Sequence, residues 1–336
     1  MKAVVATRYG PPDEVLEIRD VEMPVIGEED VLVRTHATSL NPADWHLTRG
    51  EPQIARLQIG LRHPKHPVLG CDVAGRVEAV GAEVTGFAPG DEVFGYPFPA
   101  CGAFAEYVRV PADQLAPKPA SLSFEQAAAI PLAGTTALQG LRDRGRLAAG
   151  QRILIVGGSG GVGSFAVQMA RSFDADVTAV CSTRNLDLVR DLGADHAIDY
   201  TAEDFTAGET RYDLILQVAG TTPPSACRRV LTPKGILVLI SGDSPGRRIG
   251  PVGRIVRALA MSPFVSQKLT ALNARPNRPD LDTLGQLAME GKLAPVIDRT
   301  YSLSDVPEAL RDLEAGHTRG KVVITVQATQ PGQQDR

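Results

Sequence analysis

Short apolar runs separated by glycine and proline make up the N-terminal part of the chain, up to about residue 120. The runs cover residues 3–5, 31–35, 73–80, 92–94 and 105–110, with turn signals around Gly81 and Gly90. Short apolar stretches bounded by turn-forming residues are typical of strands. We therefore expect a compact, irregular β-barrel in this part of the chain, rather than alternating strands and helices.

From Ser123 onward the pattern changes to alternating strands and helices. Ser123 is placed to cap a first helix, and helical segments flank Pro131. Apolar, β-branched runs then predict strands, and helical spacing follows the first two of them. The predicted strands are residues 152–156, 176–181, 197–199, 214–218 and 236–240. This order is that of an α/β protein with a doubly wound parallel sheet.

After Ser241 the pattern of apolar and polar residues predicts no regular element at first, and elements are predicted again further along the chain. The pattern predicts a helix over residues 281–291, a second helix capped by Ser304 and ending near Leu313, and a closing strand over residues 321–326. The last residues are polar, and we expect them to be frayed.

The strand at 152–156 leads into a glycine-rich turn and then a helix, which is the pattern of a dinucleotide-binding fingerprint. The glycines allow a tight turn, close approach of a pyrophosphate, and close packing of helix on strand. The helix N-terminus offers free N–H groups and a partial positive charge to phosphates. The residues expected to hold the phosphates are Gly158, Ser159, Gly160, Gly161, Val162 and Gly163.

The second strand of this unit predicts which nicotinamide cofactor is bound. Sites that prefer NAD place an Asp or Glu at the end of this strand, where it binds the ribose 2′-OH. Here the strand is followed by Ser182, Thr183 and Arg184. Hydroxyls and a guanidinium suit a 2′-phosphate, so we predict NADPH. The alternative is that Arg184 is a solvated residue at the start of a helix.

Composition and charge exclude several classes of protein. The chain has 336 residues, of which 43% are hydrophobic and 22% charged, with a net charge of −4. The length and composition are those of a soluble globular protein of two domains. The negative net charge gives no reason to expect binding to nucleic acid. The N-terminus does not resemble a signal peptide, and no apolar run is long enough for a transmembrane segment. We expect a cytoplasmic protein.

Residues 246–268 carry four arginines and a lysine among apolar residues. A basic amphipathic helix can lie on an anionic membrane. The alternative is a loop and helix that cover a cofactor cleft or a subunit contact. The sequence leaves both interpretations open.

Several motifs together resemble those of a known family. They are GGSGGVGSFAVQMA, STRN, LGADHAIDY, LNPADWHLTRG, HPVLGCDVAGRVEAVG, GDEVFG and GKVVITV. This set is similar to the medium-chain dehydrogenase/reductases, and within them to the zinc-independent branch of quinone oxidoreductases and enone reductases. The resemblance implies a GroES-like β-barrel catalytic domain formed by both ends of the chain, with a Rossmann domain inserted between them.

The resemblance also implies limits for these domains. Residues 1–122 would begin the catalytic domain, 123–262 would form the Rossmann domain, 263–328 would return to the catalytic domain, and 329–336 would be a flexible tail. Similar proteins are homodimers in which the Rossmann sheets pair edge to edge, and we expect the same here.

The same comparison of motifs predicts that the protein holds no metal. Zinc-dependent relatives carry ligands where this chain has Asn41, Cys71 and Leu132, and four cysteines in a loop where it has only Cys101. One thiol cannot assemble the three or four ligands that zinc requires. We expect Cys71 to be a small buried residue, and the four cysteines show no spacing typical of a disulfide framework.

Without a Lewis acid, hydride transfer suits an acceptor that is already electron-poor, such as a quinone or an α,β-unsaturated carbonyl. The resemblance places Asn41 beside the nicotinamide and the acceptor, where its amide could hold a carbonyl oxygen. Asp44 and Trp45 follow it, and Trp45 would either stack on a flat acceptor or pack in the core. Tyr96 is the candidate for a tyrosine near the pocket.

The resemblance adds further cofactor contacts. Thr136 would lie near the nicotinamide ribose, and Tyr200 would lie near the adenosine phosphate or be a solvent-edge aromatic. The other residues that line the cleft in similar proteins correspond to Ala219, Gly220, Ser241, Gly242, Asn277 and Lys321. For Lys321 the alternative is solvation of the start of the last strand.

Three functions follow from these observations. The first is an NADPH-dependent, zinc-independent reductase of small-molecule quinones or enones. The second is an NADPH-binding regulatory or membrane-associated protein with little catalysis. The basic residues of segment 246–268 are the reason to retain this alternative. The third, a zinc-type alcohol dehydrogenase, conflicts with Asn41 and Leu132.

Overall fold

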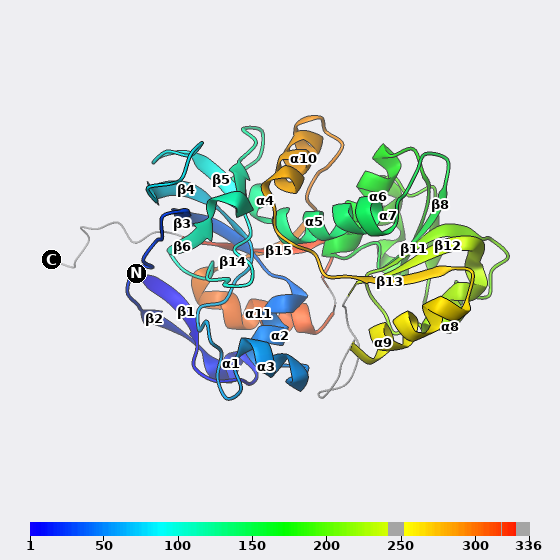
Figure 1. Cartoon of the computed structure of the whole chain (residues 1–336), viewed down its shortest axis with the longest axis horizontal. Helices are drawn as coiled ribbons and strands as arrows, with labels where there is room; N and C mark the ends of the chain where they lie inside the picture. The colour runs from blue at the N-terminus through cyan, green and yellow to red at the C-terminus, as the bar shows by residue number, and fades with distance from the viewer. Residues whose placement is uncertain (241–251, 317, 327–336) are drawn as a thin grey trace.

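The predicted strands assemble into two separate sheets in the computed structural model, which describes residues 1–240, 252–316 and 318–326 (Figure 1). One is a six-stranded parallel sheet, and the other is a seven-stranded, mainly antiparallel sheet. A short antiparallel pair, β1 (Lys2–Ala6) with β2 (Leu16–Asp20), lies apart from both. The predicted combination of a Rossmann sheet with a GroES-like domain is confirmed.

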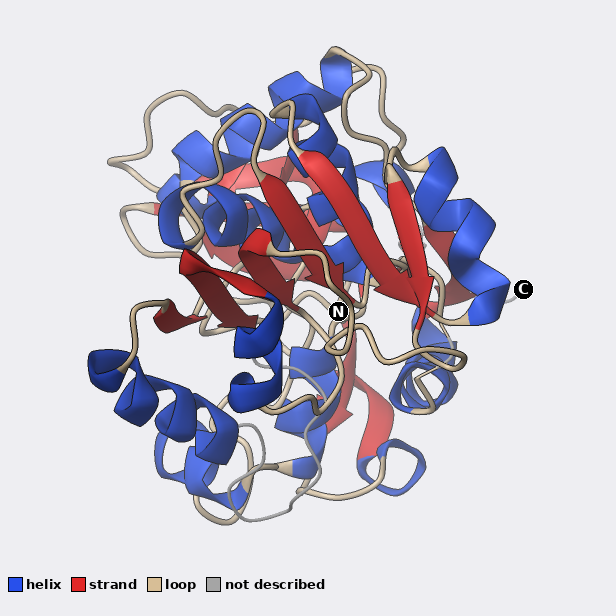
Figure 2. Ribbon diagram, turned by 90° about the vertical axis from the view of Figure 1, so that its right-hand side faces the viewer, coloured by secondary structure: helices blue, strands red, loops and turns tan. Residues whose placement is uncertain are grey.

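The parallel sheet is doubly wound, with helices on both faces (Figure 2). Its strands in spatial order are β10 (His196–Asp199), β9 (Asp176–Cys181), β8 (Arg152–Val156), β11 (Tyr212–Gln217), β12 (Leu231–Ile240) and β13 (Lys268–Leu272). The helices of this half are α5 (Pro131–Gln139), α6 (Gly161–Ser172), α7 (Leu186–Asp191), α8 (Pro224–Cys227) and α9 (Val252–Met261). Helix α4 (Phe124–Ala128) precedes α5 in the chain but packs against the second sheet.

Strand β8 shows why its apolar run is continuous rather than alternating. Ile153 and Ile155 enter the core under α5 and α6, whereas Leu154 and Val156 enter a second core that includes Ala258 of α9. A strand that is buried on both faces needs apolar residues at every position. Ser123 caps α4 as predicted, because its hydroxyl accepts a hydrogen bond from the Gln126 N–H at 3.2 Å.

The second sheet brings the two ends of the chain together. Its strands are β14 (Ile297–Ser302), β15 (Lys321–Thr325), β3 (Asp30–Ser39), β4 (Val73–Val80), β5 (Glu92–Gly95) and β7 (Leu115–Pro117), with β6 (Tyr107–Pro111) paired to β3. Its helices are α1 (Pro12–Val15), α2 (Pro42–Arg49), α3 (Arg56–Ile59), α10 (Arg278–Met289) and α11 (Val306–Glu314). Because β15 pairs with β3, the Rossmann sheet is an insertion between two parts of one barrel.

Three expectations about the C-terminal part need correction. Strand β13 belongs to the parallel sheet, although the sequence analysis assigned residues 263–328 to the catalytic domain. Polar residues interrupt both β13 (KLTAL) and β14 (IDRTYS), so neither shows the apolar run of a buried strand. Ser302, not Ser304, makes the capping box, and a 3₁₀ turn precedes α11.

Strand β13 is the edge of the parallel sheet and pairs only with β12 among the described residues. The predicted edge-to-edge dimer would pair either this strand or β10, at the opposite edge, with its copy. The predicted tail lies outside the described residues, as does the first part of the basic stretch 246–268. None of the described helices combines the length and the apolar character needed to cross a bilayer.

The fingerprint turn depends on close packing at Gly163, where a Cβ atom would lie 2.0 Å from the carbonyl oxygen of Gly157. We expect Gly163→Ala to lower the free energy of unfolding by about 1–3 kcal/mol, because α6 must move away from β8. Gly160→Ala is the matched control, since its Cβ would lie 3.6 Å from the same oxygen. Urea unfolding of both variants measures the difference, and equal stabilities would contradict this packing argument.

Candidate active site

The fingerprint turn joins β8 to α6, so the predicted order of strand, glycine turn and helix is confirmed. Gly157 has a φ of +92°, and a Cβ atom on Gly158 would lie 2.9 Å from the Cβ of Ala179 on β9. Gly160 is the N-cap of α6, so the first N–H groups of the helix are left for a ligand. These residues fit the pyrophosphate of a dinucleotide, because side chains are excluded from the backbone that would approach it.

The end of β9 lies beside this turn and carries the residues predicted to select the cofactor. The Asn185 amide donates to the hydroxyls of Ser159 at 3.0 Å and Ser182 at 3.3 Å, which ties the two segments together. Arg319 donates to the backbone carbonyl of Arg184 at 3.0 Å, so two guanidinium-bearing residues meet here. Tyr200 follows β10, and its N–H bonds the carbonyl of Cys181 at 3.1 Å.

A carboxylate that the sequence analysis did not consider also reaches this region. Asp199 ends β10 in register with Cys181, and it accepts a hydrogen bond from the Thr183 hydroxyl at 2.5 Å. Hydrogen bonds from Thr183 and Thr201 lower the pKa of Asp199. The Thr183 hydroxyl is therefore engaged within the protein, which leaves Ser182 and Arg184 as the predicted phosphate ligands.

The fingerprint turn is joined directly to the last strand of the barrel. The Gly320 N–H donates to the carbonyl of Ser159 at 2.8 Å, and Gly160 forms a β-bridge with Gly320. A Cβ atom on Gly161 would lie 2.9 Å from Cδ of Lys321. These contacts place the Lys321 side chain against the first turn of α6.

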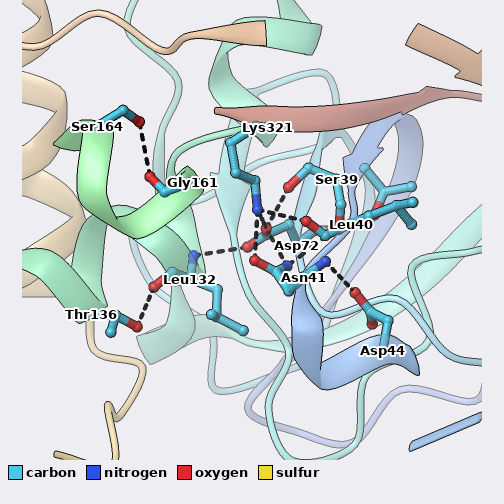
Figure 3. Close-up of polar contacts among 11 residues, drawn as sticks. Ser39, Leu40, Asn41, Asp44, Asp72, Leu132, Thr136, Gly161, Ser164 and Lys321 are labelled. Atoms are coloured by element: carbon cyan, nitrogen blue, oxygen red, sulfur yellow. Dashed lines mark hydrogen bonds and ion pairs between the residues drawn. The ribbon is translucent and has the colours of Figure 1, made fainter. Parts of the chain in front are cut away.

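Lys321 continues into a buried polar network below the turn (Figure 3). Its ammonium donates to the Asn41 side-chain oxygen at 2.6 Å and the Leu40 carbonyl at 2.9 Å, and lies 3.4 Å from an Asp72 carboxylate oxygen. The side chains of Lys321 and Asp72 are 3% and 0% exposed. Lys321 is therefore not a solvated strand start but a buried cation with one anionic partner.

Asp72 is the acceptor around which this network is arranged. One carboxylate oxygen accepts from the Ser39 hydroxyl at 2.5 Å and the Asn41 amide at 2.8 Å. The other accepts from the Leu132 N–H at 2.8 Å, near the start of α5. Three parts of the chain, around residues 39–41, 132 and 321, thus converge on one carboxylate.

The network fixes the orientation of the Asn41 amide. Its oxygen accepts from Lys321, and its nitrogen donates to Asp72 and, at 3.4 Å, to the Ser39 carbonyl. The amide that we expected to hold an acceptor carbonyl is thus bonded within the protein. Asn41 holds the start of α2 against the Lys321 ammonium.

Asp44 lies directly beneath Asn41 and is fully buried. Its carboxylate accepts from the Asn41 N–H at 2.8 Å, and the two residues form the capping box of α2. Burial raises the pKa of Asp44 from 3.8 to about 7, more than the Asn41 hydrogen bond lowers it. Asp44 stabilises the position of Asn41 and has no exposed surface toward a substrate.

The two predicted aromatic residues lie in different environments. Trp45 packs against the cluster that contains Val4 and Leu310, and its ring stacks on His46 with centroids 3.6 Å apart. Tyr96 is 1% exposed, and burial next to Asp72 raises the pKa of its hydroxyl. Tyr96 is close to the network, whereas packing explains the position of Trp45.

The remaining predicted contacts divide between the cleft and structural positions. Thr136 is buried and donates to the Leu132 carbonyl at 2.7 Å. Ala219 packs on Gly157, and its N–H bonds the Val156 carbonyl, so the Ala219–Gly220 segment lies beside the fingerprint turn. Asn277 caps α10, where its side chain accepts from the Asp280 N–H at 2.9 Å. Ser241 and Gly242 lie outside the described residues.

Sequence analysis missed four residues of this site, namely Ser39, Asp72, Asn185 and Arg319. The available signal for Asp72 was a carboxylate inside the apolar segment HPVLGCDVAG, because a buried charge requires a partner. Cys71 is buried, as predicted.

Within the described part of the chain, no three His, Cys, Asp or Glu side chains lie in a position to hold a metal ion. Asn41 and Leu132, which stand where zinc-dependent relatives carry ligands, both donate to Asp72 instead. Independence from zinc stays a prediction.

The raised pKa of Asp44 predicts a pH dependence of stability. Between about pH 4 and pH 7 the folded state holds a proton on Asp44 that the unfolded chain has lost, so the stability contributed by Asp44 falls by about 4 kcal/mol as pH rises. Asp44→Asn removes this titration and keeps an acceptor for the Asn41 N–H. We expect the variant to gain stability relative to the wild type across this window, measured by urea unfolding at several pH values. A constant difference would show that Asp44 titrates normally.

Comparison with known proteins shows the family to which the chain belongs. Residues 27–120 match the alcohol dehydrogenase GroES-like domain, and residues 192–324 match the zinc-binding dehydrogenase domain. The human mitochondrial NAD(P)H oxidoreductase RTN4IP1 is 35% identical over 97% of this chain and 89% of its own length. The 2-methylene-furan-3-one reductase of Solanum lycopersicum is 36% identical over 96% of this chain and 79% of its own.

Solved structures agree with these relatives. The quinone oxidoreductase from Coxiella burnetii has a TM-score of 0.86 and 32% sequence identity, and the similarity covers 97% of this chain and 99% of that one. The similarity extends over both sheets and the junction between them. The chain belongs to the medium-chain dehydrogenase/reductase superfamily of oxidoreductases, in its branch of quinone oxidoreductases and enone reductases.

Proposed function

We propose that this protein is an NADPH-dependent reductase of quinones or α,β-unsaturated carbonyls. The observation that carries the proposal is the direct contact between the fingerprint turn and the buried Lys321–Asp72–Asn41 network. A phosphate-binding turn and a polar site from the other domain meet at this point. The printed names of the relatives, quinone oxidoreductase and 2-methylene-furan-3-one reductase, support the same class of acceptor.

The cofactor part of the proposal rests on the turn and the end of β9. The glycine cradle and the α6 N-terminus would hold the pyrophosphate. Ser182 and Arg184, with Arg319 beside them, would hold the 2′-phosphate of NADPH through charge-assisted hydrogen bonds. Asp199 is the feature that favours NADH instead, although its carboxylate is bonded to two threonine hydroxyls. When bound, the nicotinamide supplies the hydride.

The choice of an electron-poor acceptor follows from the charge state of the network. The Lys321 ammonium is bonded to Asp72 and to two oxygen atoms of segment 40–41, so it offers little positive charge to an incoming carbonyl. An acceptor that takes hydride without strong polarisation suits this site. The residues of the network position Asn41 and the fingerprint turn. The proton that the acceptor takes up after hydride transfer comes from water, since Asp44 and Tyr96 are buried.

Steady-state oxidation of NADPH and NADH by chelator-treated protein tests this proposal, with a panel of quinones, enones and aldehydes. We expect turnover of quinones or enones that is much faster with NADPH and insensitive to chelation. Arg184→Ala should raise the KM for NADPH about tenfold or more and leave that for NADH unchanged, since a charged hydrogen bond is lost. Arg190→Ala is the control, because Arg190 pairs with the exposed Asp187.

Other outcomes of this assay identify the alternatives. Binding of NADPH without turnover of any acceptor would favour the regulatory or membrane-associated protein. Turnover of alcohols that a chelator abolishes would favour the zinc-type alcohol dehydrogenase. A preference for NADH would assign the ribose contact to Asp199.

The buried ion pair gives a second prediction. Lys321→Met leaves the Asp72 carboxylate buried without a cation, and we expect the free energy of unfolding to fall by about 3–5 kcal/mol. The double variant with Asp72→Asn should recover part of this loss, because no buried charge remains. Lys292→Met is the matched control, since Lys292 forms an exposed pair with Glu290, and we expect a change below about 1 kcal/mol. Similar losses in both lysine variants would contradict the role of the pair.

A further inference from the structure

Two cysteines that the proposed reaction does not use lie against each other beside the active site. The sulfur atoms of Cys71 and Cys101 are 2.7 Å apart, although the residues are separated by 30 positions in the sequence. The other two cysteines, Cys181 and Cys227, are buried elsewhere in the fold. Free thiols at random positions rarely approach so closely, so this pair is a chemically distinct feature of the molecule.

The backbone holds the two cysteines opposite one another. The segment before β4 and the loop between β5 and β6 are joined by hydrogen bonds from Ala103 N–H to the Gly70 carbonyl at 3.0 Å and from Phe104 N–H to the Leu69 carbonyl at 2.9 Å. Cys71 directly follows Gly70, and Cys101 lies two residues before Ala103. The approach of the sulfurs is therefore fixed by main-chain pairing as well as by the side chains.

The two thiols differ in environment. Cys71 is 0% exposed, and its hydrogen bond with Cys101 and its burial raise the pKa of its thiol. Cys101 is 5% exposed and adopts a φ of +56°, at a turn in the loop. An oxidant from solvent would therefore meet Cys101 first, and Cys71 would be the resolving thiol behind it.

We propose that Cys71 and Cys101 form a reversible oxidation site, in which hydrogen peroxide converts the two thiols to a disulfide that lowers the activity of the enzyme. The effect on activity rests on the proposed function, whereas the disulfide does not. The Cys101 sulfur attacks one peroxide oxygen, the O–O bond breaks, and the departing hydroxide takes up the thiol proton and leaves as water, so that Cys101 becomes a sulfenic acid. The Cys71 sulfur then attacks the Cys101 sulfur, the S–O bond breaks, and the departing hydroxide takes up the Cys71 thiol proton and leaves as a second water.

The connection to the active site is short. Cys71 precedes Asp72 in the chain, and its thiol also lies next to the Asp44 carboxyl, whose pKa it lowers. A bond to Cys101 would remove the thiol proton beside Asp44 and pull on the peptide that carries Asp72. Both changes act on residues that hold Asn41 and Lys321.

Treatment of the full, folded chain with hydrogen peroxide tests the proposal. We expect the number of titratable thiols in the denatured product to fall from four to two, and the tryptic peptides that carry Cys71 and Cys101 to be joined. Dithiothreitol should reverse both changes. Cys101→Ser and Cys71→Ser should each abolish the cross-link, and circular dichroism checks that they fold. The matched control Cys227→Ser should still form it.

An activity measurement on the same samples tests the consequence. Oxidised wild type and oxidised Cys227→Ser should lose at least tenfold in turnover and regain it with dithiothreitol, whereas Cys101→Ser should keep its turnover in peroxide. Absence of the cross-link in folded wild type, or unchanged turnover in fully cross-linked protein, would overturn the proposal. If no acceptor is turned over at all, the proposed function fails, and the thiol count and peptide map still decide the oxidation site.

Discussion

The buried pairing of Lys321 with Asp72 is the interaction on which the rest of the site depends. Burying two charges is costly unless each is also hydrogen bonded, and here each has further polar partners. These partners come from the ends of β3, α2, α5 and β15. One ion pair therefore links the barrel, its C-terminal strand and the Rossmann half.

This arrangement also fits the chemistry that we propose for the junction. Where zinc-dependent relatives are expected to hold a metal, this chain places an amide, a thiol and an apolar residue around an internal carboxylate. The charge of that carboxylate is balanced by a lysine from the far end of the chain. The buried network next to the fingerprint turn is therefore nearly neutral. It can orient a bound cofactor and acceptor, but it does little to polarise the acceptor carbonyl.

The sequence predicted the Rossmann unit well because its signals are local. A continuous apolar strand, a glycine turn and a helical period occupy residues 152–172, and all three follow from packing over short distances. The edge strands β13 and β14 were missed because exposure on one side permits polar residues. Asp72 was missed for a different reason, since its partners Ser39, Leu132 and Lys321 lie 33 to 249 positions away and only the fold brings them together.

The bridge between Gly160 and Gly320 has a consequence for the order in which the protein matures. A ribosome releases the chain from its N-terminus, and domains tend to fold as they emerge. The six-stranded sheet is complete once residue 272 has been released, whereas the Asp72 carboxylate still lacks its cation. Lys321, whose strand closes the barrel and whose ammonium neutralises Asp72, is released later, so the nucleotide domain can fold before the active site is complete.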